Sequence, residues 1–75
     1  MDLDKIEFFL NQATDFLIEL GQSVIERAKD NEFSEREIIR MIDNLSTIVN
    51  AMKKTNVDSG KTEKIEEIIE KLKNI

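Results

Sequence analysis

The stretch TNVDSGKT, residues 55–62, contains the residue types closest to a chemical motif in this chain. Its last three residues, Gly60, Lys61 and Thr62, match the end of a phosphate-binding P-loop, Gly-x-x-x-x-Gly-Lys-Ser/Thr. In that motif, backbone N–H groups and the lysine hold the phosphates of a nucleotide. Here Thr55 stands in place of the first glycine, and a helical pattern precedes the loop where a strand is needed. We therefore expect no nucleotide site.

The same stretch lacks the ligands of a calcium-binding loop. With Gly60 at the sixth position of such a loop, Glu66 stands correctly at the twelfth. Thr55 and Val57, however, occupy the first and third positions, where carboxylates are needed. We interpret the stretch as the turn between two helices, with Thr62 as the N-cap of the second one.

Residues for catalysis or metal binding are scarce elsewhere. The chain has no His and no Cys, so the commonest general bases, nucleophiles and transition-metal ligands are missing. Glu66 and Glu70 form the nearest approach to a carboxylate pair, but helical spacing places them beside Lys64 and Lys71 on a solvent face. We expect no enzyme, no cofactor and no metal.

Length and charge limit the class of protein further. The 75 residues fit a single helical domain, 1–75, whose core alone would contribute no more than about 3–5 kcal/mol of stability. The net charge of -5 argues against a general nucleic-acid binder, which needs clustered Lys and Arg. No apolar run approaches a membrane span and no leader pattern opens the chain, so we expect a cytoplasmic protein without membrane contact.

Three helices are predicted from apolar spacing and capping signals. Spacing of three and four residues predicts a helix over 3–29. Ser34 and Glu37 form a capping box, with Phe33 and Ile38 as a hydrophobic staple, at the start of a helix over 35–54. An isoleucine-rich stripe predicts a short helix over 62–74. The expected fold is all-α, a small three-helix bundle formed by an antiparallel helical hairpin and a short C-terminal helix, which dimerises.

The first predicted helix carries more apolar surface than two neighbouring helices can cover. Threonine, glycine and alanine recur one heptad apart on it, which allows close approach of a helix from the same or another chain. We therefore expect a protein–protein interaction module that self-associates as a homodimer and acts as a regulator, adaptor or inhibitor of another protein. The expected interface residues are Phe8, Thr14, Ile18, Gly21, Ile25 and Ala28.

Two alternatives use charge. In the first, residues 34–55 form a DNA-binding helix-turn-helix, with a break between Asp43 and Ser46. In the second, a phage- or plasmid-type protein inhibits a nucleic-acid enzyme by occlusion or DNA mimicry. Its acidic stripe consists of Asp15, Glu19 and Glu26, with Asp30 and Glu32 beyond them. The DNA-facing residues in the first alternative are Arg36, Arg40, Thr47, Asn50, Lys53 and Lys54.

Overall fold

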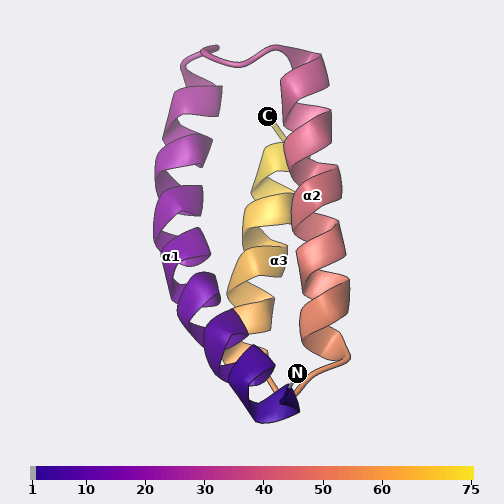
Figure 1. The fold of residues 1–75 in the computed structure, drawn as a ribbon. Helices are drawn as coiled ribbons and strands as arrows, with labels where there is room; N and C mark the ends of the chain where they lie inside the picture. Colours follow the sequence, from indigo (N-terminus) through magenta and orange to yellow (C-terminus); the bar gives the residue numbers. More distant parts are fainter. Residues whose placement is uncertain (1) are drawn as a thin grey trace.

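The computed structural model describes residues 2–75, which form the predicted all-α, three-helix bundle (Figure 1). Helix α1 spans Leu3–Lys29, α2 spans Glu35–Lys53 and α3 spans Ser59–Lys73. The chain reverses direction at each connection, so α3 is parallel to α1 and antiparallel to α2. The first helix has the predicted bounds, and the second ends one residue before the predicted Lys54.

Helix α3 begins three residues earlier than the sequence predicts. Its N-cap is Asp58, whose carboxylate Oδ1 accepts a hydrogen bond of 2.8 Å from the Gly60 backbone N–H. The predicted cap, Thr62, lies inside the first turn and is buried. Asp58 therefore lengthens α3 by one turn beyond the predicted start and brings Lys61 into the helix.

Helix α2 begins at the predicted capping box. The Ser34 backbone N–H donates to Glu37 Oε1 over 2.9 Å, and the Glu37 backbone N–H donates to Ser34 Oγ over 3.2 Å. Phe33, which precedes the cap, is half-buried against the core, and the Arg27 guanidinium lies 5.4 Å from its ring centroid. These contacts fix the connection between α1 and α2.

Acidification is expected to remove the stability that this capping box contributes. The hydrogen bonds from the Ser34 backbone and side chain hold the pKa of Glu37 below its ordinary value of 4.5. The contribution is therefore fully present above the unfolded-state pKa and is lost as the pH falls through the lower folded-state pKa. In urea denaturation at pH 7 and pH 3, the wild type should lose more stability than Glu37→Gln, which keeps an acceptor but does not titrate. Equal losses in the two proteins would contradict this.

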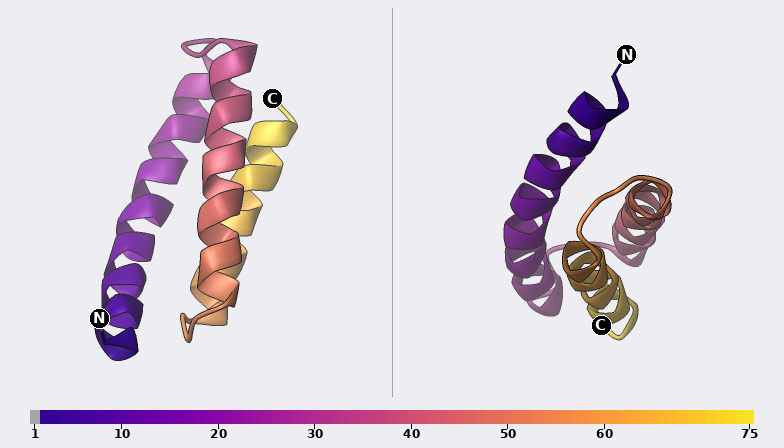
Figure 2. Two further views of the ribbon diagram at one scale, coloured as in Figure 1. Left: turned by 45° about the vertical axis from the view of Figure 1, so that its right-hand side comes forward. Right: turned by 90° about the horizontal axis from the view of Figure 1, so that it is seen from below.

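Helix α3 supplies half of the buried apolar residues of the described core, four of eight. Ile65, Ile68 and Leu72 are almost completely buried, and α3 packs extensively on both α1 and α2. The end-on view shows α3 on one side of the molecule, next to both α1 and α2 (Figure 2, right). Helices α1 and α2 contact each other far less, although Thr14 Oγ1 lies 3.8 Å from Met52 Sδ. The predicted hairpin of α1 and α2 is thus held together mainly through α3.

Small residues on α1 permit its close approach to α3. Thr14 and Ala28 are buried, and Gly21 lies directly against Ile68. A Cβ atom at Gly21 would come within 2.5 Å of Ile68 Cδ1. The stripe of α1 that faces the core is therefore the one with the smallest side chains.

Candidate functional site

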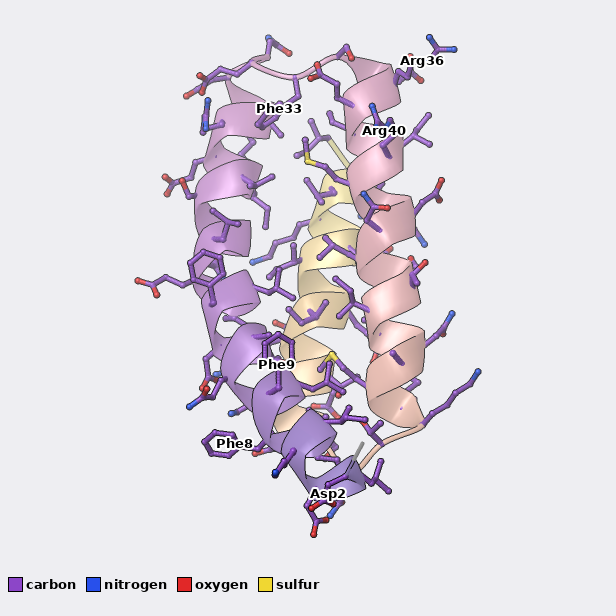
Figure 3. The ribbon with its side chains drawn as sticks, in the orientation of Figure 1. Asp2, Phe8, Phe9, Phe33, Arg36 and Arg40 are labelled. Atoms are coloured by element: carbon purple, nitrogen blue, oxygen red, sulfur yellow. The ribbon has the colours of Figure 1, made fainter. Side chains whose placement is uncertain are left out.

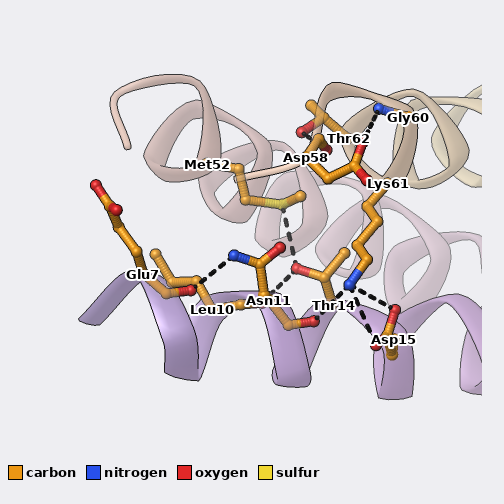
Figure 4. Close-up of polar contacts among 10 residues, drawn as sticks. All are labelled: Glu7, Leu10, Asn11, Thr14, Asp15, Met52, Asp58, Gly60, Lys61 and Thr62. Atoms are coloured by element: carbon orange, nitrogen blue, oxygen red, sulfur yellow. Dashed lines mark hydrogen bonds and ion pairs between the residues drawn. The ribbon is translucent and has the colours of Figure 1, made fainter. Parts of the chain in front are cut away.

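The Gly60-Lys61-Thr62 segment joins α3 to α1 (Figure 4). Lys61 Nζ lies 3.1 Å from Asp15 Oδ1 and donates to the Asn11 backbone carbonyl over 3.4 Å. The Thr62 hydroxyl donates to the Asp58 backbone carbonyl within the first turn of α3. Gly60 thus takes part in the cap and Thr62 bonds within the first turn. Lys61, which resembled a phosphate ligand, connects α3 to α1.

Residues 2–75 contain no group of three or more His, Cys, Asp or Glu side chains placed to hold a metal ion. Glu66, one member of the carboxylate pair seen in the sequence, lies 3.5 Å from Lys53 Nζ of α2. In this same part of the chain, no helix is both long and apolar enough to cross a membrane.

The expected interface of α1 lies mostly within the core of the same chain. Thr14, Ile25 and Ala28 are buried, Gly21 contacts Ile68, and Ile18 is half-buried against the core. Phe8 is the one member of this set that is strongly exposed. The small-residue side of α1 therefore packs within the same chain, because α3 can approach most closely there.

Three large apolar side chains of α1 are exposed on another side, and we call them the α1 ridge: Phe9, Phe16 and Leu20. Their residues are 67%, 64% and 46% exposed. Phe8 and Phe9 point away from α1 in different directions, as expected for adjacent residues of a helix (Figure 3). Their spacing of seven and four residues places them on one stripe of the helix that a heptad pattern would favour for the core, so sequence reasoning did not identify them as exposed.

An apolar groove runs beside the ridge, between α1 and α2. Its volume is about 220 Å³, and α3 forms its floor through Ile68 and Leu72. Asn44 contributes the one polar side chain among the described lining residues. The walls are formed by Leu17, Leu20, Gly21 and Val24 of α1 and by Met41, Asn44, Leu45 and Ile48 of α2.

The groove follows from the arrangement of the three helices. Because α3 packs behind α1 and α2 and these two contact each other little, their facing apolar side chains are only half-buried. In a four-helix bundle, a fourth helix would fill such a position. The groove can therefore bind an apolar surface, and its lining carries no group suited to a reaction among the residues described.

The residues expected to face DNA lie on the outside of α2. Helix α2 continues through the segment from Asp43 to Ser46, and the Thr47 hydroxyl donates to the Asp43 backbone carbonyl over 3.0 Å within it. The break required for a helix-turn-helix is therefore not formed in residues 34–55. The predicted residues Arg36, Arg40, Thr47, Asn50, Lys53 and Lys54 are all exposed.

The acidic stripe expected for DNA mimicry is partly engaged within the chain. Asp15 is paired with Lys61, whereas Glu19 and Glu26 are exposed on α1. No protein-family model, curated protein or solved structure matches this chain. The α1–α2 groove with its ridge is thus the surface on which we base a functional proposal.

Proposed function

We propose that this protein is a small protein–protein interaction module that binds through the α1–α2 groove and the α1 ridge. The observation that carries the proposal is the position of Phe9, Phe16 and Leu20, which are strongly exposed beside an almost entirely apolar groove. Fully burying a side chain of this size stabilises by about 1.5–3 kcal/mol. Covering the ridge therefore contributes favourably to association.

The shape of the groove fits a helical surface. Two helices form its walls and a third forms its floor, so a helix laid along it would complete a four-helix arrangement. Proteins commonly recognise amphipathic helices in this way, through apolar anchors spaced three or four residues apart. A regulator, adaptor or inhibitor of this kind acts by binding a helix of its partner in the groove and making that surface inaccessible to other proteins.

Affinity capture with matched phenylalanine variants tests the proposal. Phe16→Glu places a charge on the ridge, whereas Phe8→Glu changes an equally exposed phenylalanine on a different side of α1. Both variants should fold, since neither residue is part of the core. We expect wild type and Phe8→Glu to retain the same bound proteins, and Phe16→Glu to lose them by more than about tenfold, as identified by mass spectrometry.

The comparison has a defined negative result. If Phe16→Glu keeps every protein that wild type captures, the groove and ridge are not the binding surface. If Phe8→Glu alone loses them, binding takes place on the other side of α1. Circular dichroism of each variant shows whether the helical fold is retained.

A further inference from the structure

We infer that the α1–α2 groove is closed by a second copy of this chain, in a dimer with two-fold symmetry. The inference rests on the proposed role of the groove as a protein-binding surface and names its occupant. A further partner that uses the same groove would compete with the second copy.

The shape of the face supports a symmetric contact. In a two-fold dimer the same patch on both chains must be complementary to itself. Here Leu20 belongs both to the α1 ridge and to the lining of the groove. The other ridge residues, Phe9 and Phe16, therefore lie beside the groove on the same face of the molecule. A projecting row and a hollow that lie side by side allow each chain to cover the apolar side chains of the other.

The exposed area approaches what a stable dimer needs. A phenylalanine presents roughly 200 Å² when extended, so the exposed fractions of Phe9 and Phe16 leave about 130 Å² each. With Leu20 added, two copies would cover about 700 Å² through the ridge residues alone. The half-buried groove residues of both chains bring the total toward the roughly 1,000 Å² that a biological interface must exceed.

The distribution of charge also fits a second copy. The chain has a net charge of -5, yet none of the described groove-lining residues is acidic. Lys5 is the charged residue of the neighbouring hollow, which it lines with Ile6, Phe9 and Leu10. Two acidic chains can therefore meet at this face without opposing carboxylates from its lining. The lining equally offers no charge by which a foreign helix could be selected.

Sedimentation equilibrium over about 1 μM to 1 mM tests this inference. Wild type and Phe8→Glu should approach twice the monomer mass of 8.7 kDa as concentration rises. Phe16→Glu, and independently Phe9→Glu, should raise the dissociation constant at least about 100-fold, because each dimer carries the substitution twice. Far-UV circular dichroism of every sample shows whether its helical fold is intact.

Each outcome has a distinct meaning. A wild-type mass of 8.7 kDa throughout the range overturns the second copy as occupant, as does equal dissociation of Phe8→Glu and Phe16→Glu. If the wild type is monomeric but still captures another protein in a manner that depends on Phe16, the proposed function stands and this inference alone fails. If dimerisation is lost in Phe9→Glu and Phe16→Glu but kept in Phe8→Glu, the inference is supported.

Discussion

Replacing Ile65 by alanine is expected to lower the free energy of unfolding by about 2–5 kcal/mol. Ile65 is 0% exposed and lies in α3, the helix that packs against both α1 and α2. The cavity left by the shorter side chain would weaken the packing that holds all three helices. Because a core of this size contributes only about 3–5 kcal/mol, much of the variant should be unfolded at 25 °C.

Urea denaturation followed by circular dichroism measures this effect. Every comparison should use one protein concentration, because the proposed self-association would add to apparent stability. The matched control is Ile39→Ala on α2, since Ile39 is 52% exposed and leaves no comparable cavity. We expect the control to change stability by less than about 1 kcal/mol. Equal losses at the two isoleucines would show that α3 is not the centre of the fold.

Local signals account for the parts of the fold that the sequence predicted well. Apolar spacing marks α1 over its whole length, and the capping box at Ser34 and Glu37 marks the first turn of α2. Both signals act between residues a few positions apart, so they need no knowledge of tertiary structure. The start of α3 was missed because Asp58 and Thr62 are both common cap residues, and only the contact with Gly60 decides between them.

The central position of α3 could not be predicted in the same way. Its apolar stripe was narrow, and a helix of that length is unstable alone. Periodicity shows which face of a helix is apolar but not which neighbour covers that face. On α1, whose apolar surface is wide, two different sides could have met α3. The close approach of Ile68 to Gly21 determined which side was used.

Because periodicity does not show which neighbour covers an apolar face, the binding surface was predicted on other residues of α1 than those that the structure exposes. The sequence indicated that α1 carries surplus apolar area, and the structure does expose apolar side chains on this helix. The surplus lies at Phe9, Phe16 and Leu20, while the expected residues such as Ile25 and Ala28 contact the rest of the bundle. A heptad pattern favours large residues for the core, but here the small ones allowed the closest packing.

Replacing Gly21 by leucine is expected to destabilise the bundle by at least about 2 kcal/mol, despite the better helix propensity of leucine. The first added atom, Cβ, would lie 2.5 Å from Ile68 Cδ1 and 3.2 Å from its Cγ1 and Cγ2 atoms. Rotation of Ile68 Cδ1 alone does not make room, because Cγ1 and Cγ2 are also closer than ordinary van der Waals contact. The leucine would therefore push α1 away from α3. Gln22→Leu, at the neighbouring exposed position, should leave stability almost unchanged.

A double-mutant cycle with Ile68→Ala separates this steric effect from a general loss of helix stability. Ile68→Ala alone should cost about 2–5 kcal/mol, because it leaves a cavity opposite Gly21. In the double variant, the new leucine can occupy that cavity. The loss of stability in the double variant should therefore be smaller than the sum of the two single losses by at least about 1 kcal/mol. Urea titrations in the presence of sucrose raise the folded fraction of all four proteins at the start, because sucrose strengthens effective burial. Additive losses would mean that Gly21 and Ile68 are not in contact, and that α1 meets α3 along a different stripe.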